Sequence, residues 1–129
     1  MIISVIVGIF IGILANRNRS HLVNAQFIRD HLHFRKKLDI ETVRNSNKVM
    51  VCLAFGQSNS ANYGNGTYKC RNKVYNFYKG SLYLAKEPLL GPDGGGCSVW
   101  TRVSDMLIDS GLYEKVVIDG ITGSVLCSC

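Results

Sequence analysis

The sequence predicts an α/β fold built on a parallel sheet. Three segments carry this prediction: an apolar run rich in β-forming residues at 48–55, "KVMVCLAF"; an amphipathic stretch at 98–111, "SVWTRVSDMLIDSG"; and a second apolar run at 115–119, "KVVID". Continuous apolar runs of this length are typical of strands buried on both faces of a parallel sheet. Because strand, helix and strand follow in that order, we expect a right-handed crossover that places the two strands parallel.

The first element is a hydrophobic segment at 1–15, "MIISVIVGIFIGILA". As a helix it would span about two-thirds of a 30 Å hydrocarbon layer, between the length of a transmembrane helix and that of a signal-peptide core. Its flanking charges, Arg17 and Arg19, follow the apolar run, whereas a secretory signal carries them in front. We therefore expect an uncleaved membrane anchor formed by residues 2–15 and a membrane-associated protein, with the side of the membrane left open. A buried strand or helix is the less favoured alternative.

The second element, 16–47, is a basic and polar linker. From Asn16 to Lys48 the chain has eight Lys or Arg and three acidic residues. Apolar and aromatic positions recur at spacings of three and four, which predicts an amphipathic helix; they are Val23, Phe27, His31, Phe34 and Leu38. Two interpretations stay open: a stalk whose Arg35, Lys36 and Lys37 contact anionic headgroups, or an ordinary solvated helix.

Several partner classes find no support in the sequence. From Val49 onward the chain has seven basic and six acidic residues and no basic stripe with interleaved aromatics, which argues against nucleic acid. The histidines all lie in the linker, and the five cysteines form no C-x-x-C pair, so no metal site is predicted; Cys52 lies mid-strand and is expected in the core.

The middle of the chain, 59–96, is expected to be a long insertion between the first strand and the helix. It contains "KVYNFY" at 73–78, which predicts a small extra strand, and the loop "EPLLGPDGGG" at 87–96. The helix that follows should end near Gly111, a favourable C-terminal cap. Its core-facing side is predicted from four apolar residues: Val99, Val103, Met106 and Leu107.

A candidate nucleophile follows the first strand. Ligand sites in open parallel sheets gather at the carboxyl ends of the strands, and Ser58 lies at such an end. Gly56 permits a sharp turn, and the Ser58 N–H would face a developing oxyanion. If the two strands are neighbours, their ends lie about 5 Å apart, and Gly123 in "GITGS" would supply a second N–H donor.

The stretch "FGQSN" resembles the first block of the SGNH hydrolase superfamily, in the branch of sialate O-acetylesterases and related carbohydrate esterases. The similarity continues in order to about Val125. It implies a three-layer α/β/α, flavodoxin-like fold, with Ser58 as nucleophile, Gly123 as the second-block glycine, and Gly56, Gln57 and Asn59 as the supporting motif. It also implies ester hydrolysis without a metal or an organic cofactor, on an acetylated carbohydrate.

The sequence departs from that family where its acid and base should lie. The family's Asp-x-x-His pair and its third-block Asn have no counterpart here, and no histidine follows Ser58. We therefore expect 48–129 to be the amino-terminal part of such a domain, an incomplete fold preceded by a hydrophobic helix. Two functions follow: a serine esterase that removes acetyl groups from a sugar, here as a fragment, or a non-catalytic, membrane-tethered remnant or interaction module.

Overall fold

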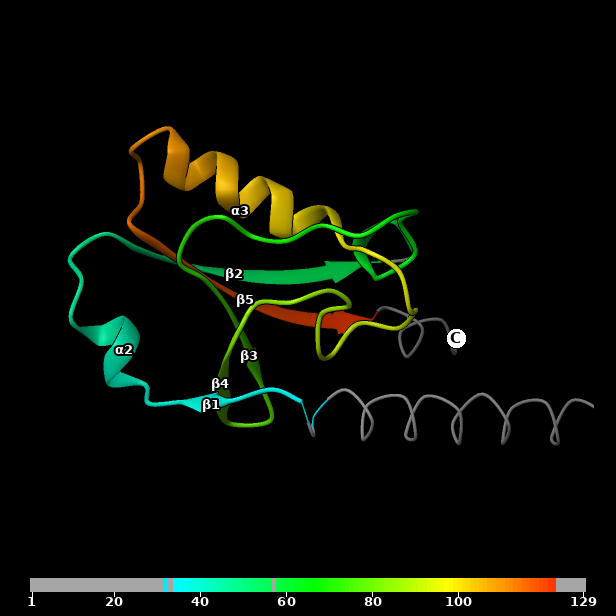
Figure 1. The fold of residues 1–129 in the computed structure, drawn as a ribbon, viewed down its shortest axis with the longest axis horizontal. Helices are drawn as coiled ribbons and strands as arrows, with labels where there is room; N and C mark the ends of the chain where they lie inside the picture. The colour runs from blue at the N-terminus through cyan, green and yellow to red at the C-terminus, as the bar shows by residue number, and fades with distance from the viewer. Residues whose placement is uncertain (1–31, 33, 57, 123–129) are drawn as a thin grey trace, which may run out of the picture. The chain divides into compact units, whose positions relative to one another are not determined.

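A computed structural model describes residues 32, 34–56 and 58–122 (Figure 1). The chain divides into two compact units, 1–34 and 35–129, and the fold described below is that of the second. The hydrophobic segment 1–15 lies outside the described residues. Within the described part of the chain, no helix has both the length and the apolar character needed to cross a membrane.

The second unit is an α/β fold around a mixed five-stranded sheet (Figure 1). The strands, in spatial order, are β1 (Lys37–Leu38), β4 (Ser81–Leu84), β3 (Val74–Tyr78), β5 (Lys115–Thr122) and β2 (Val49–Gly56). The helical elements are α2 (Glu41–Arg44), the 3-10 turn η1 (Ser58–Ser60) and α3 (Val99–Asp109). Strands β3, β5 and β2 are parallel, whereas β4 is antiparallel to both of its neighbours. The α/β class is confirmed, and the expectation of a wholly parallel sheet is wrong.

The predicted strand–helix–strand unit is present as β2, α3 and β5. Strands β2 and β5 pair in parallel over their whole length, from Val49 opposite Lys115 to Gly56 opposite Thr122. Helix α3 is preceded by Ser98, whose side chain caps the helix by accepting a hydrogen bond from the Trp100 N–H at 3.3 Å. This unit brings the carboxyl ends of β2 and β5 side by side.

The predicted core face of α3 is wrong at Val99 and Met106, whereas Val103 and Leu107 are half-buried. Val99 and Met106 are 50% and 68% exposed, and the fully buried residues of the helix are polar: Thr101, Ser104 and Asp105. Trp100 and Ile108 pack against the core of the sheet. Polar side chains occupy the inner face because each has a hydrogen-bond partner there.

The expected insertion contributes a β-hairpin to the sheet. The predicted extra strand is confirmed as β3, and β4 returns beside it through a two-residue turn at Lys79 and Gly80. Both turn residues have positive φ, 46° and 72°, as in the tight turns that match strand twist. Since β3 also pairs with β5, the hairpin makes the sheet mixed.

Strand β2 is not buried on both faces, contrary to the prediction. It lies at the edge of the sheet, and its alternate residues Val51, Leu53 and Phe55 are 65%, 63% and 73% exposed. The other face of β2 packs Met50, Cys52 and the buried Ala54 into the core, as expected for Cys52. The sheet face opposite α3 is covered in part by α2, through Val43 and its neighbours, and is open over β2.

The sheet begins earlier than residue 48. Leu38 pairs with Leu82 of β4, so Lys37–Leu38 is extended and the amphipathic helix predicted through Leu38 does not reach that residue. Helix α2 follows at once and buries Val43. The carboxyl-terminal part of the predicted linker therefore belongs to the folded unit.

Candidate active site

Strand β2 ends in the sharp turn that the sequence predicts. Gly56 has φ +147°, in the region that favours glycine. A Cβ at this position would lie 3.0 Å from Ser60 Cβ and 3.1 Å from Ser60 Oγ. Any side chain at Gly56 would therefore push η1 away from the end of the strand.

Ser58 is the first residue of η1 and follows the carboxyl end of β2. Because Gly56 pairs with Thr122, the residues after β2 and β5 leave the same edge of the sheet. Gln57, Gly123 and the side chain of Ser58 lie outside the described part of the structure. The backbone geometry thus places Ser58 beside the end of β5, which the oxyanion hypothesis requires.

Two hydrogen bonds hold the turn that carries Ser58. Ser60 Oγ donates to the carbonyl of Phe55 at 3.1 Å, which ties the end of η1 back to β2. Trp100 Nε1 donates to the carbonyl of Ser60 at 3.1 Å, which ties the same residue to α3. Trp100 was not predicted to be a residue of the site. Its one distinguishing feature in the sequence is that it is the single tryptophan of the chain.

A buried asparagine connects the turn to the loop that precedes α3. Asn62 is fully buried, and its Nδ2 donates to the carbonyls of Leu89 and Pro92 at 2.8 and 3.0 Å. Its Oδ1 accepts from the Leu89 N–H at 2.9 Å. This amide satisfies three backbone groups that would otherwise be buried without partners.

The same loop lies against the carboxyl end of β5. A Cβ on Gly120 would lie 2.5 Å from Pro92 Cγ, and one on Gly91, whose φ is +110°, would overlap the carbonyl of Gly120. These close approaches explain why the segment is rich in glycine. The loop 87–96, predicted only as a connection, therefore packs against the carboxyl end of β5.

A pocket of about 370 Å³ lies beside η1. The residues that line it include two asparagines, a tyrosine and an arginine; the lining is Asn59, Ala61, Tyr63, Gly64, Asn65, Cys97, Ser98, Val99 and Arg102. The Arg102 guanidinium lies 5.2 Å from the centre of the Tyr68 ring. Asn59, which belongs to the predicted motif, is thus part of a pocket that offers hydrogen bonds and a stacking surface.

Glu87 is the half-buried carboxylate at the start of α3. Desolvation raises its pKa, against hydrogen bonds from the Thr101 hydroxyl and the Ser98 N–H and the nearby charges of Arg35 and Arg102. The Ser98 N–H donates at 2.9 Å. Arg35 also donates to the carbonyl of Pro88. Glu87 is therefore occupied in fixing the amino end of α3.

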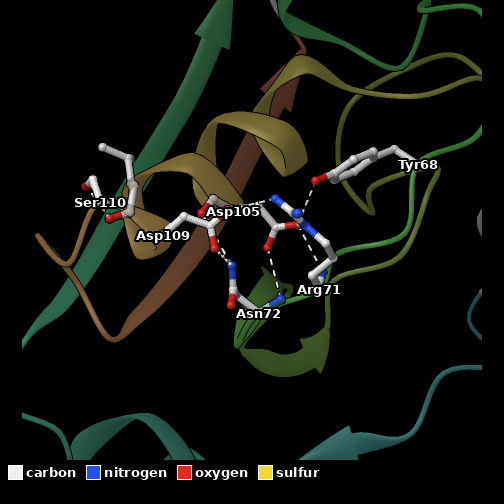
Figure 2. Close-up of polar contacts among 7 residues, drawn as sticks. Tyr68, Arg71, Asn72, Asp105, Asp109 and Ser110 are labelled. Carbon is white, nitrogen blue, oxygen red and sulfur yellow. Dashed lines mark hydrogen bonds and ion pairs between the residues drawn. The ribbon is translucent and has the colours of Figure 1, made fainter.

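Asp105 is the buried carboxylate of α3, and Figure 2 shows its partners. It accepts hydrogen bonds from the Tyr68 hydroxyl at 2.7 Å and from the backbone N–H groups of Arg71 and Asn72 at 2.9 and 3.0 Å. Burial alone would raise the pKa of Asp105, but these hydrogen bonds outweigh it and lower the pKa. Asp109 binds the Arg71 and Asn72 side chains at 2.7 and 2.8 Å, so both carboxylates fasten segment 68–72 to α3.

No group of three or more His, Cys, Asp or Glu side chains suited to a metal ion is found among the described residues. His21, His31 and His33 lie outside them. Comparison of the chain with protein-family models, with curated proteins and with solved structures finds no match in any of the three. Interpretation of the site therefore depends on its own residues and geometry.

Proposed function

We propose that this chain carries the nucleophile of a serine ester hydrolase of the SGNH type, in the sialate O-acetylesterase-like branch. The proposal extends the α/β fold to the three-layer, flavodoxin-like arrangement of that family. One observation supports it above all: Ser58 stands in a tight turn at the carboxyl end of a parallel strand, two residues after a glycine at φ +147°. Such a turn presents a serine at the edge of the sheet where ligands bind.

The proposed reaction is hydrolysis of an acetyl ester on a sugar. The Ser58 hydroxyl attacks the ester carbonyl and loses its proton to a general base, and the backbone N–H groups of Ser58 and Gly123 stabilise the tetrahedral oxyanion. Collapse breaks the ester C–O bond, and the leaving sugar oxygen takes the proton. Water then hydrolyses the acetyl-serine to acetate and free serine, so no metal or organic cofactor enters the chemistry.

The described residues around the turn include no histidine that could serve as the general base. No histidine follows His33 in the sequence, and two carboxylates packed at α3, the half-buried Glu87 and the buried Asp105, are held in hydrogen bonds. The resemblance implies an Asp-x-x-His pair downstream of the second block, and the residues that follow Gly123 in this sequence include neither Asp nor His. We propose that such a pair completes the site in the native protein, and that residues 2–15 tether it to a membrane.

The pocket beside η1 supports a sugar as the substrate. Its volume of about 370 Å³ is near the lower end of the range typical of small-molecule sites, roughly 300–1,000 Å³. Tyr63 is 59% exposed and offers a ring on which a sugar can stack, and Asn59 and Asn65 offer amide donors and acceptors. The pocket shares Asn59 with the turn, so a sugar bound there lies next to Ser58.

The test compares hydrolysis of an acetylated sugar and of p-nitrophenyl acetate by the native protein and by its Ser58→Ala variant. We expect kcat/KM to fall by at least about 10³-fold in Ser58→Ala, as for loss of a catalytic serine. Ser110→Ala is the matched control, because Ser110 is an exposed serine at the far end of α3. Equal activity of Ser58→Ala and Ser110→Ala would contradict the proposal.

The second candidate function is a non-catalytic, membrane-tethered interaction module. The lack of any histidine after His33 favours it, because a serine hydroxyl without a base is a weak nucleophile. It predicts that native preparations hydrolyse neither ester above the rate of the Ser58→Ala variant.

A further inference from the structure

The turn at Asn65 and Gly66, in the wall of the pocket beside η1, has an anchored side and an open side. Gly64 and Cys97 exchange two backbone hydrogen bonds, at 2.9 and 3.0 Å, and the Cys97 thiol donates to the Asn65 carbonyl at 3.3 Å. Beyond that carbonyl the contacts end. Within the described part of the chain, neither the Asn65 side chain nor the Gly66 N–H has a hydrogen-bond partner, and both residues are exposed.

Asn65-Gly66 is the single Asn-Gly dipeptide of the sequence. In such a dipeptide the glycine nitrogen can attack the side-chain carbonyl carbon of the asparagine, because glycine has no side chain to obstruct the approach. The attack needs a nitrogen that is not held in a hydrogen bond and a backbone that is free to turn. Gly66 meets both needs: its φ is +90°, and a Cβ built on it would find no heavy atom within 4 Å.

We propose that Asn65 is a site of deamidation that changes the charge of the pocket beside η1. The Gly66 nitrogen forms a bond to Asn65 Cγ, the bond from Cγ to the side-chain nitrogen breaks, and ammonia leaves with the proton of the Gly66 N–H. Water then breaks one of the two ring C–N bonds of the cyclic imide. One opening gives aspartate, and the other gives isoaspartate, whose main chain runs through the former side chain. An amide and a water become a carboxylate and an ammonium ion, so the step needs no oxidant or reductant.

The product alters the pocket in two ways. Among the described residues that line the pocket, Arg102 alone is charged, so a carboxylate at position 65 cancels its positive charge. The amide donor is also lost, because a carboxylate only accepts hydrogen bonds. The consequence for a bound sugar rests on the proposed function: with one donor fewer, KM for an acetylated sugar should rise. The deamidation itself does not depend on that function.

Peptide mass spectrometry of the full chain in a mild detergent tests the site. Native protein is incubated at pH 6 and at pH 8 and then digested at acidic pH, where the reaction is slow. Asn47, which is exposed but followed by lysine, and the buried Asn62 are controls within the same digest. We expect Asn65 to gain the mass of an amide-to-acid exchange first, with isoaspartate among the products. Its rate should be higher at pH 8, because the deprotonated Gly66 nitrogen is the attacking group.

A parallel incubation in guanidinium chloride separates the effect of the fold from that of the dipeptide. An open turn predicts that Asn65 converts as fast in the native chain as in the unfolded chain. A native rate at least about tenfold below the unfolded rate would overturn the proposal, because it would mean that the fold protects the turn. Asn65→Gln keeps an amide but would have to form a larger ring, so its peptide should keep its mass.

Asn65→Asp carries the product permanently and measures its effect on the pocket. Asn47→Asp is the matched control, because it adds the same charge before the amino end of β2, whereas η1 follows the carboxyl end. We expect KM for the acetylated sugar to rise severalfold in Asn65→Asp, with kcat unchanged, and neither constant to change in Asn47→Asp. Equal KM values in the two variants would overturn the effect on the pocket.

The two proposals fail separately. Conversion of Asn65 in a chain that hydrolyses no ester would support the deamidation site and count against the esterase alone. An active esterase whose Asn65 stays unconverted at pH 8, or converts no faster than Asn47, would overturn the deamidation site alone.

Discussion

Replacing Asp105 by asparagine tests whether the carboxylate contacts of α3 stabilise the fold. Asp105 is fully buried; its Oδ2 accepts from the Tyr68 hydroxyl and the Arg71 N–H, and its Oδ1 accepts from the Asn72 N–H. Asparagine has the same shape but one NH₂ in place of an oxygen. Whichever way the amide turns, at least one backbone N–H then faces another donor.

The expected loss is about 2–4 kcal/mol. A hydrogen bond to a charged group contributes about 1.5–3 kcal/mol, and a buried donor left without a partner costs about 1–3 kcal/mol, two contributions that overlap. The Arg71 guanidinium lies 3.9 Å from Asp105 and is 68% exposed, so this ion pair adds less than about 1 kcal/mol.

The assay is urea unfolding in one detergent, followed by Trp100 fluorescence and circular dichroism. Asp109→Asn is the matched control, because Asp109 is 48% exposed and should lose less than about 1 kcal/mol. A loss below about 0.5 kcal/mol for Asp105→Asn, or equal losses for the two variants, would refute the reasoning.

Three further predictions concern pH, packing and thiol reactivity. Because folding lowers the pKa of Asp105, its carboxylate should contribute fully to the free energy of unfolding above the unfolded pKa of 3.8, and this contribution should disappear as the pH falls through the folded pKa. In urea unfolding from pH 6 to pH 2, the free energy of unfolding should therefore fall more steeply in the unmodified chain than in Asp105→Asn, and parallel curves would contradict this. Gly120→Ala should lose about 1–3 kcal/mol in the same urea assay, because the new Cβ meets Pro92 at 2.5 Å; unchanged stability would show that the loop yields. Burial and nearby carboxylates raise the pKa of Cys70 to about 12, so iodoacetamide at pH 8 should modify it only after unfolding, and modification of the native chain would disprove its burial.

The sequence predicted the parts of the fold whose signals are local. The strand at β2, the helix α3 and the strand at β5 follow from apolar runs and helical spacing, and their parallel pairing follows from chain order. Strand β3 was found as an apolar segment, but its partner β4 was missed because Lys79-Gly80 is a weaker hairpin signal than Asn-Gly.

Other features depend on contacts far along the chain. An apolar run does not reveal whether its strand lies at the centre or the edge of a sheet, so the exposure of Leu53 could not be predicted. The inner face of α3 is polar because Glu87 and segment 68–72 supply hydrogen-bond partners for Thr101 and Asp105, and the spacing of residues within the helix gives no sign of these partners. At the site, Gly56 and Ser58 were predicted from a sequence motif. Asn62 and Trp100 were missed because they donate hydrogen bonds to backbone carbonyls far away in the sequence, and residue spacing does not reveal such contacts.

The most direct test of the central claim is labelling of the native protein with a fluorophosphonate, followed by mass spectrometry of its peptides. Ser58 as an activated nucleophile predicts one adduct, located on Ser58, that is absent from the Ser58→Ala variant and present in Ser110→Ala. An adduct on a different serine, or no adduct in native protein that is folded and intact, would contradict the assignment of Ser58 as the nucleophile.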